Sequence, residues 1–238
     1  MFETVLGTSS GQRERLESIL EGYQYTQDTT GDVNHCKIPP ELALRVYDIL
    51  QNIAARAKAG EFDHVGVSIA IVHQPKNSDY ILSMDDDYFE GKEVSIYHPT
   101  IADQIAESCE FDGGITIDAE GDILEAGVMF TSNPKKVLED MGIPNHRKLP
   151  ARFGFSEPVG TRHISAISAS YRIPDALIFM LSEENNTVRA FYCGKIINSP
   201  HEEETVWREK EETGDVYGSV SLPYRLLKGP EGNGLEAT

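Results

Sequence analysis

Residues 160–196, GTRHISAISASYRIPDALIFMLSEENNTVRAFYCGKI, contain a helix start followed by two strand-like runs. Gly160 and Thr161 precede a helical pattern, and threonine is a common residue at a helix N-terminus. ALIFML and TVRAFYCGKII are apolar, β-branched or aromatic, and the polar SEENN between them is typical of a turn. A helix followed by strands predicts a sheet on which helices pack.

The chain before this stretch alternates between helical and strand patterns. Residues 38–60 have prolines at the start, one apolar face and a final glycine, which predicts a helix. VGVSIAIV (65–72) is apolar on both faces, as expected of a strand buried within a sheet, and residues 98–110 predict another helix. GGITID and ILEAGVMF, on either side of AEGD, predict a hairpin within 113–130. We therefore expect an α/β or α+β fold whose mixed central sheet is flanked by helices.

The remaining segments define the expected domain limits. Residues 1–40 form an N-terminal extension with one short amphipathic helix, residues 41–200 form the main domain, and residues 201–238 form an acidic tail or extension. Residues 131–159 are rich in Pro, Lys and Arg, which favours a long irregular loop near an active site. The acidic triplet at 85–87 favours a solvated turn over a metal site, because the full spacing of a calcium loop is missing.

Composition excludes several classes of protein. The 238 residues carry 39 acidic and 21 basic side chains, so the formal charge of −18 disfavours direct binding of nucleic acid or of an anionic membrane. The sequence contains no apolar run of membrane-spanning length and no secretory leader pattern, so we expect a cytoplasmic protein. The three cysteines are widely separated, which favours neither a disulfide framework nor a zinc site.

Three short polar clusters, FDGG (111–114), GTRH (160–163) and SEE (182–184), lie at the ends of predicted strands and helices. Carboxylates in the first and third suit magnesium or manganese, although Asp112 could equally be an ordinary turn residue and Glu183 and Glu184, taken alone, favour a solvated turn. Arg162 and His163 add potential cations to the positive N-terminus of a helix, which makes sense if a phosphate binds there, although both could be solvated. Together the clusters contain the groups needed for metal-assisted nucleotidyl or phosphoryl transfer.

The order of these motifs resembles that of the diadenylate cyclase domain, found in the DNA integrity scanning protein and in stand-alone bacterial and archaeal cyclases. That family has a DGA motif, then a GTRHR-type motif that opens a helix, then a strand that ends in SEE. The strong resemblance covers residues 110–197. It implies a nucleotidyltransferase that condenses two ATP molecules into the second messenger cyclic di-AMP, with release of pyrophosphate, using Mg²⁺, Mn²⁺ or Co²⁺.

The resemblance also implies roles for individual residues. Asp112, Arg162 and His163 would be catalytic, and the metal would be held by Asp112 with Glu183 or Glu184. The ATP-binding residues would be Gly113, Gly114, Gly160, Thr161, Arg162, His163 and Ser182. Each domain of this family binds one ATP, so the bond forms between two domains that meet face to face, and a chain with one such domain would act as a homo-oligomer.

The sequence departs from the family pattern at two positions, Gly114 in place of alanine and Ile164 in place of arginine. Losing an arginine beside phosphates could cost about 2 kcal/mol of transition-state stabilisation unless another cation replaces it. Arg147, Lys148 or Arg152 could supply that charge. Ile164 therefore keeps an alternative open, a catalytically inactive relative that binds a nucleotide as a sensor. A structural α/β protein without a nucleotide site is a third possibility.

Overall fold

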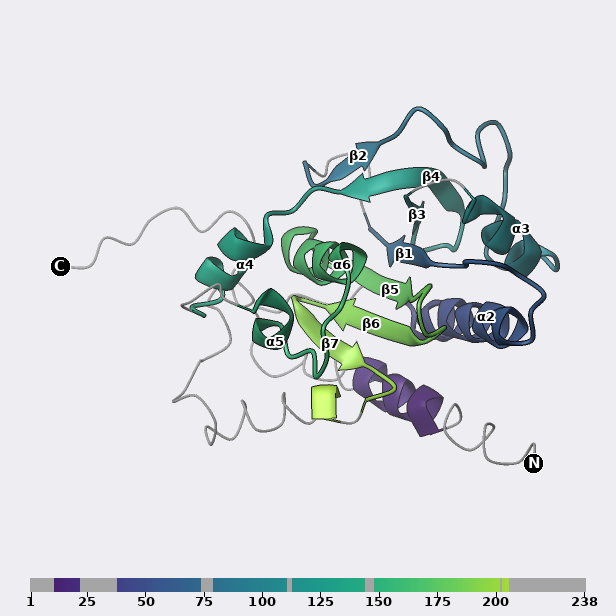
Figure 1. Ribbon diagram of the computed structural model, residues 1–238. Helices are drawn as coiled ribbons and strands as arrows, with labels where there is room; N and C mark the ends of the chain where they lie inside the picture. The colour runs from purple at the N-terminus through teal and green to yellow at the C-terminus, as the bar shows by residue number, and fades with distance from the viewer. Residues whose placement is uncertain are drawn as a thin grey trace.

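The computed structural model describes residues 11–21, 38–73, 79–110, 113–143, 148–201 and 203–205 (Figure 1). Short helices cover residues 11–21 and 203–205. The labelled helices are α2 (Pro40–Lys58), α3 (Ile101–Ser108), α4 (Pro134–Asp140), α5 (Leu149–Arg152) and α6 (Thr161–Arg172). The strands are β1 (Val67–Ile71), β2 (Ile81–Ser83), β3 (Gly114–Ile117), β4 (Ile123–Phe130), β5 (Leu177–Leu181), β6 (Val188–Tyr192) and β7 (Lys195–Asn198).

The strands form one seven-stranded sheet in the order β2-β4-β3-β1-β5-β6-β7. Strand β1 lies at the centre and runs parallel to β3, while every other neighbouring pair is antiparallel. All five residues of β1 are buried, as expected of a strand covered on both faces. The predicted mixed sheet flanked by helices is confirmed, as are the central strand and the 113–130 hairpin.

Helices cover both faces of the sheet, which gives two apolar cores (Figure 1). Successive side chains of β5 alternate between them: Phe179 and Leu181 face the core under α2 and α3, whereas Ile178 and Met180 face the core under α6 and α4. Leu16 of the helix at 11–21 is buried in the α2 core, so this helix shares the core of the main domain. No helix in the described residues has the length and apolarity needed to cross a membrane.

The run TVRAFYCGKII is two strands rather than the single strand expected from its composition. Cys193 and Gly194 form a two-residue turn between β6 and β7, with φ values of 51° and 74°. Positive φ at both central residues is the geometry of a tight hairpin turn whose twist matches that of the flanking strands. The Gly194 N–H also donates to Ser170 Oγ at 3.1 Å, which ties the turn to α6.

The described part of residues 131–159 contains two short helices, α4 and α5, where the composition predicted an irregular loop. Asn133 caps α4 by accepting a hydrogen bond from Lys135 N at 3.1 Å, and Pro134 occupies the first helical position, where its missing N–H costs nothing. Val137 and Leu138 of α4 are buried in the α6 core. Asn-Pro before an apolar pair was a helix-start signal that the overall polarity of the segment obscured.

The acidic triplet has a structural explanation. Asp87 Oδ1 accepts hydrogen bonds from Phe89 N and from Ala126 N, both at 2.9 Å, so this carboxylate joins the loop to β4. Asp85 and Asp86 belong to an irregular segment after the edge strand β2. The sequence predicts a solvated turn for this triplet. In the described part of the chain, no group of three or more acidic, histidine or cysteine side chains has the geometry to hold a metal ion.

Candidate functional site

One end of the sheet gathers most of the residues singled out in the sequence. Val67 at the start of β1 pairs with Leu181 at the end of β5, and Ile69 pairs with Ile115 near the start of β3. Gly113 and Gly114 at the start of β3, and SEE after β5, therefore lie at the same edge. The first turn of α6 reaches this edge through a contact with SEE. We call this edge the strand-end site.

The strand-end site is organised around the carboxylate of Glu183. Arg162 Nη1 donates to Glu183 Oε2 at 3.2 Å, and His64 Nδ1 lies 3.4 Å from Glu183 Oε1. The side chains of Arg162 and Glu183 are 46% and 40% exposed, and that of His64 is 87% exposed. An ion pair this open contributes little to stability. Because its side chains are exposed, they are accessible to a charged ligand.

Gly66 allows the two sides of the strand-end site to approach each other. A Cβ atom at this position would lie 2.8 Å from Glu183 Cβ, 3.2 Å from Arg162 Nη1 and 3.2 Å from Glu183 N. Only a hydrogen atom fits between these groups, because real Cβ atoms do not come so close to other heavy atoms. The absence of a side chain just before β1 therefore sets the position of the Arg162–Glu183 pair.

The glycines of the DGG motif are required by the packing of the chain itself. Gly113 has a φ of +124°, and a Cβ there would lie 2.8 Å from Gly127 Cα. A Cβ on Gly114 would lie 2.8 Å from Ser68 Oγ and 2.9 Å from Ser68 O. These contacts leave no room for the alanine of a DGA motif at position 114, and the approach of a nucleotide to the two glycines remains a prediction. Asp112 lies outside the described residues.

The N-terminus of α6 differs in detail from the expected cap. Gly160 is the N-cap and Thr161 is already the first helical residue, so the sequence-based interpretation of Thr161 as the N-cap, drawn from the frequency of threonine at that position, is wrong. No side chain caps the helix by a hydrogen bond, and Gly160, Thr161 and Arg162 are all exposed. The N–H groups of the first turn and the helix dipole therefore provide a positive surface for an anion.

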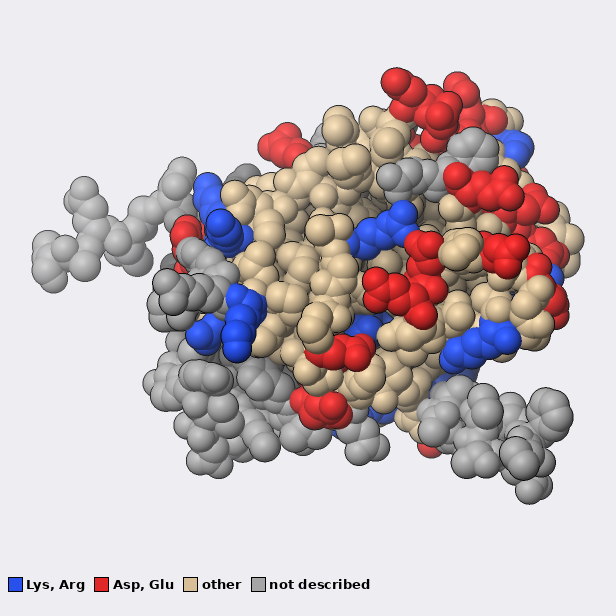
Figure 2. Space-filling model, viewed as in Figure 1, with Lys and Arg blue, Asp and Glu red and all other residues tan. Residues whose placement is uncertain are grey.

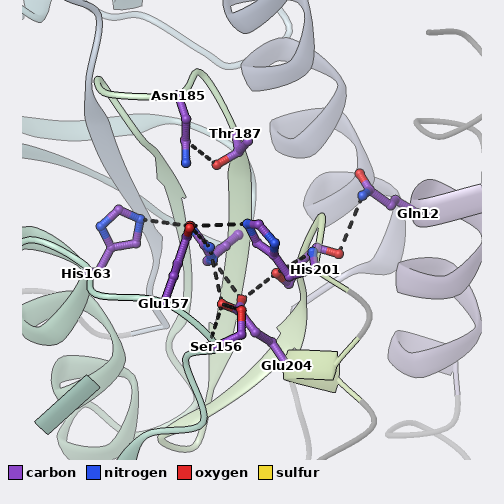
Figure 3. A network of polar contacts seen from close by, with 10 residues as sticks. Gln12, Ser156, Glu157, His163, Asn185, Thr187, His201 and Glu204 are labelled. Atoms are coloured by element: carbon purple, nitrogen blue, oxygen red, sulfur yellow. Dashed lines mark hydrogen bonds and ion pairs between the residues drawn. The ribbon is translucent and has the colours of Figure 1, made fainter. Parts of the chain in front are cut away.

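His163 does not belong to this exposed surface. Its ring is buried and packs edge-on against Phe155 at 6.0 Å between centroids. His163 Nε2 lies 3.4 Å from Arg189 Nη1, within the network of polar contacts drawn in Figure 3. Burial and the neighbouring Arg189 lower the pKa of His163 to about 4. The sequence-based expectation of a cationic His163 is therefore wrong at neutral pH, because the ring is desolvated and faces an arginine.

The SEE turn contributes one buried and two exposed residues. Ser182 is buried, its N–H donates to Thr187 O at 2.9 Å, and its carbonyl accepts from Asn186 N at 3.0 Å. Glu183 and Glu184 are exposed. Exposed carboxylates suit Mg²⁺ or Mn²⁺, which are commonly held by one or two carboxylates while water and substrate phosphates complete the coordination. Glu183 fits such a site when a metal ion replaces Arg162 and His64 as the partners of its carboxylate.

Sequence reasoning missed three neighbours of this site. Gly66 was hidden within a strand pattern, and His64 stands in no recognisable motif, although it adopts a φ of 54°, which is uncommon for a non-glycine residue. The charges of the site act on the nearby Cys109 thiol. Burial raises its pKa to about 12, while the charge of Arg162 acts to lower the pKa and that of Glu183 acts to raise it. Only the tertiary structure brings these residues to the SEE turn.

Charged side chains of both signs are spread over the face shown in Figure 2. Acidic side chains are most numerous toward α3, basic ones gather toward α4 and α5 and again over α2, and both signs meet near the middle beside α6. Lys148 is exposed and Arg152 partly exposed, beside or within α5. Whether they replace the family arginine remains a prediction, and Arg147 lies outside the described residues. Ile164 itself packs against the α6 core.

Comparisons with known proteins found similar solved structures, among them two at 19% sequence identity. A hypothetical membrane spanning protein from Bacillus cereus matches with a TM-score of 0.42, over 65% of this chain and 61% of that chain, which is less than two thirds of its length. A double mutant of DacA from Staphylococcus aureus matches with a TM-score of 0.39, over 72% of this chain and 94% of that chain. No protein-family model and no curated protein sequence matches the chain.

Proposed function

We propose that this protein is a metal-dependent diadenylate cyclase that condenses two ATP molecules into cyclic di-AMP and pyrophosphate. The observation that carries the proposal is the convergence of separate motifs at the strand-end site. Gly114 begins β3, Arg162 lies in the first turn of α6 and Glu183 follows β5, yet all three lie at one edge of the sheet. These are the motifs by which the sequence resembles diadenylate cyclases.

The first turn of α6 suits the triphosphate. Its exposed N–H groups lack a side-chain cap, and the guanidinium of Arg162 can donate to two phosphate oxygens at once. Arg162 now pairs with Glu183, so ATP would exchange one anionic partner for another. A divalent ion would neutralise phosphate charge, with Asp112 and Glu183 or Glu184 as the protein ligands that the resemblance implies.

The reaction is a displacement at phosphorus. The 3′-hydroxyl oxygen of one ATP forms a bond to the α-phosphorus of the other, the bond to the β-phosphate breaks, pyrophosphate leaves and the hydroxyl proton is released. A second displacement closes the ring. Because each domain presents one ATP, two copies must meet face to face, and positioning supplies much of the rate enhancement. Asp112 would lie near the attacking hydroxyl.

A nucleotide-binding sensor without catalysis is the second candidate. Ile164 packs into the α6 core and His163 is neutral, so Arg162 is the one cationic side chain in the first turn of α6. Such a turn could bind phosphates yet stabilise a transition state poorly. ATP binding without product would favour this candidate.

The deciding experiment incubates the purified protein with ATP and Mg²⁺ or Mn²⁺, and identifies the products by chromatography with mass detection. Cyclic di-AMP should form with wild type and disappear in Asp112→Asn and Arg162→Ala. Arg13→Ala is a matched control, because Arg13 also forms a half-exposed ion pair, with Asp48, away from the strand-end site. Absence of product with both metals, together with saturable ATP binding by calorimetry, would replace the cyclase by the sensor.

A further inference from the structure

Arg189 is a buried cation on β6. Its side chain is 1% exposed, and its strand neighbour Met180 belongs to the α6 core. A charge removed from water in this way is tolerated only when it is well paired, and a buried ion pair is often no more stabilising than apolar side chains of the same volume. The partners of Arg189 therefore indicate what the charge is used for.

The main partner of Arg189 is Glu204, from the short helix at 203–205. Arg189 Nε donates to Glu204 Oε2 at 2.9 Å and Nη2 donates to Oε1 at 3.2 Å, while the Glu204 side chain is 0% exposed. Burial acts to raise the pKa of Glu204, but hydrogen bonds from Arg189 and Ser199 outweigh it and the pKa is lowered. Glu204 is therefore an anion at neutral pH.

Besides the Ser199 hydroxyl, which donates to Glu204 Oε2, and the Phe155 ring, the contacts of this pair lie in residues 156–163, directly before and within the first turn of α6 (Figure 3). Glu204 Oε1 accepts from both Ser156 N and Ser156 Oγ at 3.1 Å. Arg189 Nη2 donates to Glu157 Oε1 at 3.2 Å, and Nη1 lies 3.4 Å from His163 Nε2. Because arginine can only donate, Nε2 of the neutral His163 ring accepts this hydrogen bond.

We propose that Arg189 and Glu204 are positioning residues of the nucleotide site, an inference that rests on the proposed function. Gly160, Thr161 and Arg162 are exposed, and no side chain caps their helix. The buried pair holds the chain on both sides of them, at Ser156 and Glu157 before the helix and at His163 one residue after Arg162. The network thereby fixes where the first turn and Arg162 stand relative to Glu183.

Glu204→Gln tests this, because the amide keeps the shape of the side chain but removes its charge and one acceptor oxygen. Asp140→Asn is the matched control. Asp140, at the end of α4, pairs at 2.5 Å with Arg172, which is nearly buried and lies in the last turn of α6. Both variants should lower the melting temperature. Only Glu204→Gln should weaken ATP binding by calorimetry, by roughly tenfold, because a small displacement of a binding group has large effects.

Amide hydrogen exchange provides a readout that does not need ATP. Glu204→Gln should accelerate exchange within residues 156–163 and leave α4 unchanged, whereas Asp140→Asn should do the reverse. Unchanged ATP affinity in Glu204→Gln, or an equal loss in Asp140→Asn, would overturn the inference. Wild-type protein that binds no ATP would overturn the proposed function instead, and exchange would then decide alone whether the network holds this segment.

A double variant, Arg189→Met with Glu204→Leu, covers the case in which the single variant fails to fold. Apolar replacement of a buried ion pair commonly preserves stability, so the fold should survive while the contacts to Ser156, Glu157 and His163 are lost. We expect ATP affinity to stay reduced at a melting temperature close to that of wild type. A stable double variant that binds ATP as tightly as wild type would show that the network serves only the core.

Discussion

Gly66 and His163 show how much single positions determine at the strand-end site. Gly66 leaves room for the Arg162–Glu183 pair, because any Cβ there would overlap Glu183. His163 follows Arg162 in sequence but points the other way, into a buried network. Two adjacent residues of one helical turn thus have different roles. Arg162 faces solvent, whereas His163 attaches the turn to the buried network.

Gly66→Ala should destabilise the fold and weaken ATP binding. The added Cβ forces Glu183 and Arg162 apart, and crowding of this kind costs about 1–3 kcal/mol. Urea denaturation and calorimetry with ATP measure the two effects. Gly11→Ala is the control, because nothing lies within 4 Å of a Cβ at that position. Normal ATP affinity in Gly66→Ala would contradict the placement of the binding site.

His163 should make the fold sensitive to acid. Because its pKa falls from 6.5 in the unfolded chain to about 4 in the fold, the unfolded chain binds a proton that the folded chain does not between these values. The stability contribution is complete above about pH 6.5 and is lost as the pH falls toward 4, by on the order of 3 kcal/mol. Glu204, whose pKa is lowered, adds a loss only below its ordinary value of 4.5.

Denaturant titrations at several pH values would check this window. His163→Asn should flatten the dependence of stability on pH between 6.5 and 4.5, where Glu204 is still ionised. His98→Asn, at an exposed position, should leave the wild-type slope in place. An unchanged slope in His163→Asn would mean that the buried ring is not the source of the acid sensitivity.

At the scale of the elements, α6 and the β6–β7 hairpin support each other. The Gly194 N–H donates to Ser170 Oγ of α6, and a Cβ on Gly194 would lie 3.1 Å from Tyr171 Cβ and 3.3 Å from Met141 Sδ. The tight turn thus fits against the C-terminal half of α6. The N-terminal half of the same helix carries Arg162, so the hairpin supports the helix away from the strand-end site.

Gly194→Ala should therefore lower stability without affecting the strand-end site. A φ of 74° and the contact with Tyr171 both oppose a side chain here, at a cost of about 1 kcal/mol or more. The melting temperature should fall and ATP affinity should not change. In the same assay, Cys193→Asn should be tolerated, because Asn-Gly is the preferred pair in such turns. Equal stability of Gly194→Ala and wild type would argue against this turn geometry.

On the scale of the whole molecule, one chain presents one copy of the strand-end site. If each copy binds one ATP, as proposed, product requires an encounter between two copies, and this chain carries a formal charge of −18 that opposes the encounter at low ionic strength. Salt screens repulsion between exposed charges. Self-association and its dependence on salt are therefore properties of the whole chain rather than of the site.

Specific activity should rise with protein concentration and, at low protein concentration, with moderate salt. The first effect follows from the need for two copies, and the second from screening of their repulsion. Initial rates of cyclic di-AMP formation over a dilution series, with sedimentation in parallel, would measure both. A specific activity that does not depend on concentration while the protein sediments as a monomer would contradict the two-copy mechanism.

Much of this protein could be predicted from its sequence because the decisive signals are local. The apolar run at 65–72, the helix at 40–58 and the hairpin at 113–130 follow from periodicity and turn residues. The helix α4 within residues 131–159 could not be predicted in this way, because it depends on a cap and two buried side chains within a polar stretch. The motifs GTRH and SEE could be identified as candidates, but not which of their residues face solvent.

Only the tertiary structure decided how these residues are used. Arg162 and Glu183 meet because β1 and β5 run antiparallel and bring Gly66 beside the SEE turn, which no local pattern encodes. His163 is neutral because its ring is buried and β6 places Arg189 against it, and Glu204 joins them from a segment whose sequence predicts an acidic tail. Hydrophobic periodicity acts between near neighbours in the chain, whereas charge, burial and pKa depend on groups that only folding brings together.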